Sequence, residues 1–291
     1  MTDFLNKYGF VPDKEEMNRT LERIASNLSD INNPEVLKEC FSMMDLTSLK
    51  SDDTPASILR LVEKVNAFAN DYPSYPMPAS ICVYPNLASV VRSNLADKNV
   101  HVTAVAGCFP TSQSFLEVKV RECELAVLSG ADEIDIVLAL NAFLAGEDER
   151  AKEEIVEIKK VCAAKGVVLK VILETGVLQS DELIHRASML AMEAGADFIK
   201  TSTGKVSVNA TPQAARVMCT AIKEFYAKTG RKVGFKAAGG VSNADEALEY
   251  YQIGLDILGP EWMNKNLFRF GVSRLGNSLM SAIEGKEIKF F

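Results

Sequence analysis

The sequence predicts a (β/α)8 TIM barrel preceded by an amino-terminal helical extension. Short apolar runs rich in Val, Ile and Phe alternate with longer segments of helical periodicity along most of the 291 residues. This alternation is typical of a parallel sheet with helical crossovers, and eight such units match the usual size of a closed barrel. A doubly wound open sheet is the alternative, but no Gly-x-Gly-x-x-Gly follows the first predicted strand.

The extension is expected to cover residues 1–33 and the barrel domain residues 34–291, because no linker rich in Pro, Gly or Ser divides the chain further. A helix over residues 33–40, with Pro34 in its first turn, leads into the barrel. Within the extension, apolar residues at helical spacing predict one amphipathic helix: Met17, Leu21, Ile24 and Leu28.

The eight strand–helix units follow in order along the chain, each apolar run being bounded by turn residues. The predicted strands are residues 43–46, 79–84, 101–106, 133–138, 167–173, 197–201, 232–237 and 255–258. The predicted helices are residues 55–70, 87–96, 114–130, 148–164, 180–194, 212–229, 244–251 and 263–283.

The composition argues against several classes of function. The chain is 47% hydrophobic and carries a formal charge of −7. Proteins that bind nucleic acid or anionic membranes usually present a basic surface, so neither partner is expected. No apolar stretch is long enough to span a membrane, and the first ten residues lack the pattern of a secretory signal, so we expect a cytoplasmic protein.

The sequence also predicts neither a metal site nor a disulfide framework. Its two histidines, His101 and His185, are far apart in the chain. The six cysteines are scattered without a Cys-x-x-Cys pair, which is typical of reduced and mostly buried thiols: Cys40, Cys82, Cys108, Cys123, Cys162 and Cys219. We therefore expect no metal and no cofactor.

Three consecutive predicted strands each carry a lysine in an apolar run. These lysines are Lys170, Lys200 and Lys236, and the preceding strand carries Asp135. Active sites of such barrels lie at the carboxyl ends of the strands, so these side chains are expected to meet in one interior. A single lysine at a strand end is readily explained by an amine that reaches water along its apolar stem, but three in succession favour a site.

The chemistry favoured by this cluster is nucleophilic attack by an amine. A free lysine is almost entirely protonated at neutral pH, and only the neutral amine attacks a carbonyl carbon. Burial lowers the pKa of a lysine, and a neighbouring cation lowers it further, so Lys236 beside Lys200 would produce a usable amine. Asp135 could move protons for that amine, although a simple salt bridge is the other interpretation.

Glycine-rich turns follow the same strands and predict a phosphate site. Gly204 and Lys205 follow the sixth strand, Gly239 and Gly240 follow the seventh, and glycine lets backbone amides approach an anion. Ser273 lies in a further turn near the last predicted helix, and barrels often bind phosphate with late loops and a helix amino terminus. A phosphorylated substrate is implied.

The motifs taken together closely resemble those of deoxyribose-phosphate aldolases. The resemblance rests on Phe198-Ile199-Lys200-Thr201-Ser202-Thr203-Gly204-Lys205, Ala131-Asp132-Glu133-Ile134-Asp135 and Gly234-Phe235-Lys236 with Gly239-Gly240. It implies a class I aldolase, a lyase of deoxyribonucleoside catabolism on a (β/α)8 barrel. Such an enzyme reversibly cleaves 2-deoxy-D-ribose 5-phosphate to D-glyceraldehyde 3-phosphate and acetaldehyde without a metal.

The resemblance also implies roles for individual residues. Lys200 matches the Schiff-base lysine, Lys236 the lysine that lowers its pKa, Asp135 the proton-relay aspartate and Lys170 a further active-site lysine. The positions matching the substrate pocket and the phosphate region are Asp45, Thr47, Cys82, Thr201, Gly204, Lys205, Gly239, Gly240 and Ser273. One departure is Arg274, which stands where a second serine is often found.

Two other functions remain open on the sequence. Another Schiff-base aldolase or a transaldolase of phosphosugars would share the reactive lysine, and a non-catalytic phosphosugar-binding barrel would share the glycine turns. The three lysines favour catalysis over mere binding. The sequence does not determine the oligomeric state, and a homodimer is the assembly that we consider.

Overall fold

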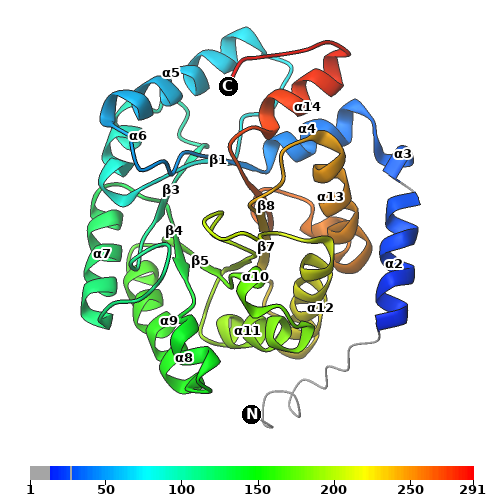
Figure 1. Cartoon of the computed structure of the whole chain (residues 1–291). Coiled ribbons are helices and arrows are strands. Elements are labelled where there is room, and N and C mark those ends of the chain that lie inside the picture. Colours follow the sequence, from blue (N-terminus) through cyan, green and yellow to red (C-terminus); the bar gives the residue numbers. More distant parts are fainter. Residues whose placement is uncertain (1–13, 27) are drawn as a thin grey trace.

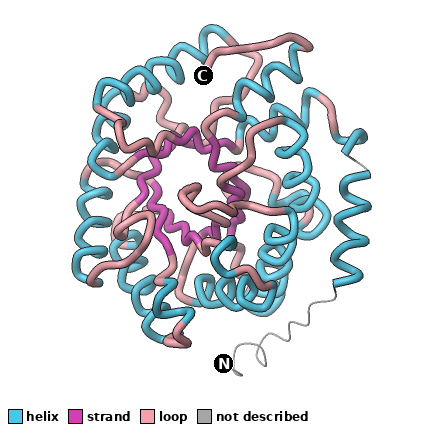
Figure 2. Tube along the Cα trace, viewed as in Figure 1, coloured by secondary structure: helices cyan, strands magenta, loops and turns pink. Residues whose placement is uncertain are grey.

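Eight parallel strands close into a barrel in the computed structural model, which describes residues 14–26 and 28–291 (Figures 1 and 2). Each strand pairs with its neighbours in the sequence, and β1 also pairs with β8 to close the sheet. The predicted fold class is confirmed. The strands are β1 (Met44–Thr47), β2 (Ser80–Val83), β3 (His101–Val105), β4 (Glu133–Val137), β5 (Val168–Ile172), β6 (Phe198–Lys200), β7 (Gly234–Ala238) and β8 (Phe268–Val272).

Helices surround this barrel on its outer side, as the ring of coils in Figure 2 shows. No helix among the described residues is both long enough and apolar enough to cross a membrane. The helices that follow the amino-terminal extension are α4 (Pro34–Ser42), α5 (Pro55–Asp71), α6 (Ala88–Asn94), α7 (Leu116–Leu128), α8 (Leu140–Leu144), α9 (Asp148–Ala163), α10 (Thr175–Leu178), α11 (Asp181–Glu193), α12 (Pro212–Thr229), α13 (Ala244–Leu258) and α14 (Leu275–Glu284).

Local sequence explains where several of these helices begin. The side chain of Asn33 accepts hydrogen bonds from the first amides of α4, and Thr54 and Ser57 form a reciprocal capping box at the start of α5. Thr211 and Asn243 cap α12 and α13 in the same way. These caps satisfy amide groups that have no partner within the helix, and so they fix the points at which loops give way to helices.

The eighth predicted strand, at residues 255–258, is wrong, because this segment is the last turn of α13. Its apolar residues continue the helical spacing of the preceding turns, with Tyr251, Leu255 and Leu258 each packed against the core. The true eighth strand, β8, lies within residues 263–283, which had been predicted to be helical. The last helix therefore starts later, at Leu275.

The amino-terminal extension packs on the outside of the barrel, against α12 and α13, as Figure 1 shows. The predicted amphipathic helix corresponds to α2 (Lys14–Ser26) and α3 (Leu28–Ile31). Residues 1–13 and 27 of the predicted extension lie outside the described residues. Ile24 of α2 is buried in the core cluster, and Arg23 forms an ion pair of 2.5 Å with Asp256 of α13. The described part of the extension thus covers outer helices of the barrel.

The carboxyl-terminal segment packs against α4, α5 and α14. Asn277 of α14 accepts hydrogen bonds from the amides of Phe290 and Phe291 and donates one to the Phe291 carbonyl. Both rings contact Phe68 of α5. The tail therefore forms part of the outer core of the protein.

Candidate active site

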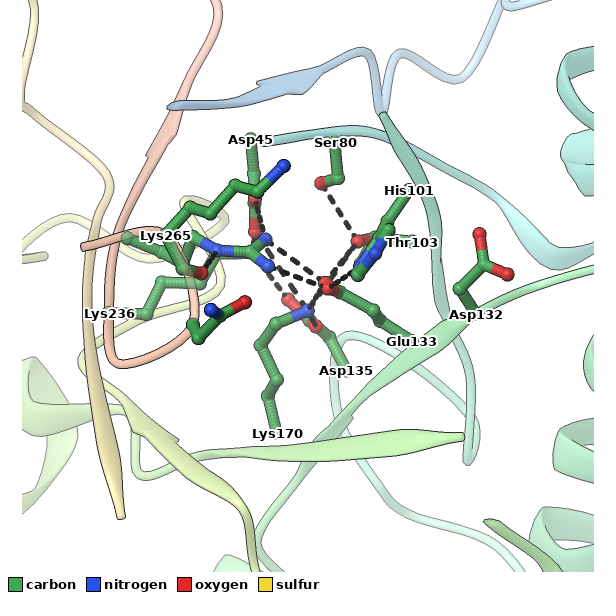
Figure 3. Close-up of polar contacts among 12 residues, drawn as sticks. Asp45, Ser80, His101, Thr103, Asp132, Glu133, Asp135, Lys170, Lys236 and Lys265 are labelled. Carbon is green, nitrogen blue, oxygen red and sulfur yellow. Dashed lines mark hydrogen bonds and ion pairs between the residues drawn. The ribbon is translucent and has the colours of Figure 1, made fainter. Parts of the chain in front are cut away.

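Three lysines from neighbouring strands converge on one carboxylate inside the barrel. Strand alternation turns Lys200 into the interior and Ile199 away from it, and the register places Lys200 beside Lys236 and Lys170 beside Asp135. The Nζ atoms of Lys200 and Lys236 lie 2.9 and 2.8 Å from Oδ2 of Asp135, and that of Lys170 lies 2.9 Å from Oδ1. Figure 3 shows Lys170 and Lys236 directed toward Asp135.

Only one of these three lysines reaches the cavity above the cluster. Lys170 and Lys236 are completely buried, whereas Lys200 is 3% exposed and lines a cavity of about 420 Å³. The cavity lies at the carboxyl ends of the strands, where barrels of this type place their active sites. A small aldehyde that enters it can therefore contact Lys200 but neither of the other two amines.

The pKa values of the three lysines shift in different directions. Burial lowers the pKa of Lys200, and the cation of Lys236 adds to this lowering, although Asp135 opposes it. Burial alone would also lower the pKa of Lys170 and Lys236. Asp135 and Glu133 outweigh burial at Lys170, and Asp135 and Asp45 outweigh it at Lys236, so the pKa of both lysines is raised. Lys200 is thus the amine that loses its proton most readily.

Asp135 stays ionised in this environment. Burial alone would raise its pKa, but Lys170, Lys200 and Lys236 outweigh burial and hold the pKa well below the usual range. A carboxylate in contact with the reactive amine can accept and return its protons. The cluster therefore joins an amine of lowered pKa, an ionised carboxylate and two amines that keep their protons.

The cavity wall contains most of the residues predicted to bind substrate, including all those predicted to bind phosphate. The loops after β6, β7 and β8 meet there, and the amino terminus of α14 begins directly after Arg274. The backbone at Gly239 has φ +78°, and a Cβ there would lie 2.7 Å from the Asn209 side chain, so this close approach requires glycine. Predicted residues that line the cavity, besides Lys200, are Thr47, Gly204, Lys205, Gly239, Gly240 and Ser273.

Three other predicted binding residues lie beneath the cavity and do not line it. Asp45 is buried and paired with Lys236 at 2.5 Å, and Cys82 is buried, which raises the pKa of its thiol. Thr201 uses its hydroxyl to bridge the backbone carbonyl and amide of Ala238. The structure thus brings these residues close to the site as supports of the reacting side chains and of the β7 terminus.

Comparison with known proteins agrees with this arrangement. Residues 40–255 match the sequence profile of the DeoC/LacD family aldolases. A Caenorhabditis elegans protein, provisionally named deoxyribose-phosphate aldolase, is 42% identical over 267 residues, which are 90% of this chain and 86% of that protein. The chain belongs to the DeoC/LacD aldolase family.

Solved structures share the fold of this aldolase. A Toxoplasma gondii structure, provisionally given the same enzyme name, has a TM-score of 0.76 at 23% identity and shows the common fold alone, covering 87% of this chain and 95% of that one. The deoxyribose phosphate aldolase of Aeropyrum pernix, described as tetrameric, has a TM-score of 0.69 at 26% identity. The match covers 89% of this aldolase and 96% of the Aeropyrum pernix chain.

The sequence analysis missed a second layer of charged residues below the lysines of this aldolase. Arg269 of β8 contacts Glu133 of β4. Glu133 in turn contacts His101 of β3, as Figure 3 shows. Arg269 was missed because its strand had been predicted to be helical. The signal was present in Phe268-Arg269-Phe270, where one charge interrupts an apolar run as the lysines do.

The loop that follows the reactive lysine is held by another residue that the sequence analysis did not select. Glu174, which follows β5, is buried and has a left-handed backbone with φ 56°. Its carboxylate accepts hydrogen bonds from both the amide and the hydroxyl of Thr203. This contact fixes the start of the turn that carries Gly204 and Lys205 to the cavity of the aldolase.

Replacement of Lys236 by Leu should reduce activity at neutral pH by at least about tenfold and restore part of it at alkaline pH. Without the Lys236 cation, the protonated form of Lys200 is favoured, so its pKa rises and the acidic limb of kcat/KM moves to higher pH. The measurement is the pH profile of both proteins. Lys236→Arg, which keeps the charge, should be less impaired. An acidic limb that does not move in Lys236→Leu would contradict the role of Lys236.

Proposed function

We propose that this aldolase is a class I enzyme that reversibly cleaves 2-deoxy-D-ribose 5-phosphate to D-glyceraldehyde 3-phosphate and acetaldehyde. The observation that carries the proposal is the Lys200 amine, which lines the cavity, has a lowered pKa and contacts Asp135 at 2.9 Å. A neutral amine beside a carboxylate suits imine formation with an aldehyde. The names of the relatives supply the substrate.

In the proposed mechanism, Lys200 attacks the C1 carbonyl of the open-chain sugar and forms a carbinolamine. Asp135 accepts and returns protons as water leaves and a protonated imine forms. Asp135, acting through a water, then accepts the proton of the C3 hydroxyl, and the C2–C3 bond breaks. C3 becomes the aldehyde of the departing D-glyceraldehyde 3-phosphate, and the electron pair of the broken bond forms an enamine with the imine nitrogen. Protonation of the enamine at C2 and hydrolysis release acetaldehyde and regenerate the amine.

The phosphate group of the substrate is proposed to lie among the turns after β6, β7 and β8. Gly204, Gly239 and Gly240 have left-handed backbones that allow close approach of an anion. Lys205, Ser273, the neighbouring Arg274 and the amino terminus of α14 surround the same space and favour negative charge there. Thr47 lines the same cavity. This arrangement holds the phosphate away from Lys200 and leaves C1 near the amine.

Residues 34–291 are proposed to form the catalytic domain, and residues 1–33 an extension outside it. Every residue assigned to the mechanism lies in the barrel, and the described helices of the extension, α2 and α3, pack against α12 and α13. A cytoplasmic location is also proposed. The six cysteines are free thiols, five of them buried, which suits a reducing compartment.

Reduction with cyanoborohydride in the presence of acetaldehyde should label Lys200, because it is the accessible lysine of the cluster whose amine loses its proton most readily. Peptide mass mapping checks the site, and the labelling should persist in EDTA. Acetaldehyde should also be accepted as donor in place of dihydroxyacetone phosphate. Labelling of Lys170 or Lys236 in place of Lys200 would refute the assignment, and a preference for dihydroxyacetone phosphate would indicate another Schiff-base aldolase.

A homodimer formed through α7 is proposed as the assembly of this aldolase. Four large apolar residues, exposed by 48 to 78%, form a stripe along the outer face of this helix: Phe115, Val118, Leu125 and Leu128. Such a stripe can pack against its own copy about a twofold axis. A second copy suits the stripe because the same apolar residues would then cover one another.

Leu128→Asp should convert the dimer to a monomer, since it places a charge within the apolar contact. Light scattering after gel filtration measures the mass. Leu144→Asp provides a matched control, because Leu144 is 51% exposed but lies on α8 outside the stripe. A wild-type protein that is monomeric at every concentration, or a dimer unaffected by Leu128→Asp, would contradict the proposed assembly.

A further inference from the structure

A buried ion pair lies beneath the lysine cluster and takes no part in the proposed chemical steps. The guanidinium of Arg269 donates to Asp45 at 2.5 Å and to Glu133 at 2.7 Å, so it crosses the barrel from β8 to β1 and β4. Glu133 also pairs with Lys170 at 2.5 Å. Neither Arg269 nor Glu133 lines the cavity, so neither can touch a substrate there.

The barrel strands carry three buried acidic groups and four buried basic groups. These are Asp45, Glu133, Asp135, Lys170, Lys200, Lys236 and Arg269. Burial opposes every charge, but contacts with opposite charges lower the pKa of all three carboxyls and raise that of Lys170, Lys236 and Arg269. Three negative groups therefore balance three positive groups. The interior is electrically neutral only when the fourth basic group, Lys200, is uncharged.

Other polar groups also face this ion pair. His101 of β3 contacts Glu133 at 2.7 Å and is about one third exposed, at the amino-terminal end of the barrel. Thr103 donates its hydroxyl to Glu133 and lies beside Ser80 of β2. Cys82, also on β2, keeps its proton because burial raises its pKa. The backbone carbonyl of Lys265 accepts from the Arg269 Nε.

We propose that Arg269 and Glu133 are positioning residues whose opposite charges keep the amine of Lys200 uncharged and available for imine formation. The proposal rests on the imine role assigned to Lys200 above. If Arg269 is removed, the interior has an excess of negative charge, and a proton on Lys200 restores neutrality. If Glu133 is removed, the interior has an excess of positive charge, and a proton on Lys200 becomes less favourable.

These two changes should therefore move the same pH profile in opposite directions. The rate of cyanoborohydride-trapped imine formation at Lys200 with acetaldehyde is measured against pH. Arg269→Gln should move the acidic limb to higher pH by roughly one unit, and Glu133→Gln should move it to lower pH by a similar amount. The double variant, in which neither charge is present, should return the limb close to its wild-type position.

Control variants separate this electrostatic effect from a loss of structure. Arg269→Lys keeps the positive charge and should leave the limb near that of wild type. Glu154→Gln breaks a similar buried ion pair, the 2.5 Å contact with Lys119 between α7 and α9, and should not move the limb. Circular dichroism shows whether Arg269→Gln folds. If it does not, the charge effect is tested by two results: the acidic limb is displaced in Glu133→Gln, and it returns to its wild-type position in the double variant.

Three results would overturn the inference: limbs that move in the same direction in both single variants, limbs that stay in place, or a double variant that keeps the shift of Glu133→Gln. Failure of the proposed function itself looks different. In that case the wild-type protein would be labelled at a lysine other than Lys200. If the inference alone fails, Lys200 is still labelled, and only the pH profiles of the variants differ from those expected.

Discussion

The carboxylate of Asp135 contacts the amines of Lys170, Lys200 and Lys236, and the arrangement of the active site depends on these contacts. A buried ammonium without a partner is so costly that it gives up its proton or reaches water. Asp135, with Glu133 and Asp45 below it, provides enough negative charge for two of these lysines and for Arg269. Lys200 is the remaining amine, and it is also the one that borders the cavity. Charge balance and access together therefore favour Lys200 as the proposed nucleophile.

The fold contributes by placing one charged side chain on almost every strand at a defined height in the barrel. Lys200 lies beside Lys236 in the register of β6 and β7, and Asp135 lies beside Lys170 in that of β4 and β5. The lower layer of Arg269 and Glu133 separates this cluster from the amino-terminal end of the barrel. The loops after β6, β7 and β8 form the cavity above it, so substrate meets the cluster only from the carboxyl end.

The sequence was sufficient to predict the barrel, the lysine cluster and the glycine turns, because a charge within an apolar strand and a glycine after it are local signals. It was not sufficient for the eighth strand. Residues 255–258 are as apolar as a strand, and only their packing as the last turn of α13 distinguishes them. The same error hid Arg269. The positions of Thr201, which supports β7, and Cys82, which lies beneath the cavity, depend on side-chain contacts that spacing does not reveal.

The active site depends on a lowered pKa of Lys200 beside two lysines that stay charged. Competitive labelling with a trace of acetic anhydride, followed by peptide mass mapping, reports the pH at which each lysine becomes reactive. The structure predicts that Lys200 is labelled at a clearly lower pH than the exposed lysines of the same chain, and that Lys170 and Lys236 are not. A Lys200 amine that becomes reactive only at the same pH as the exposed lysines would contradict the account.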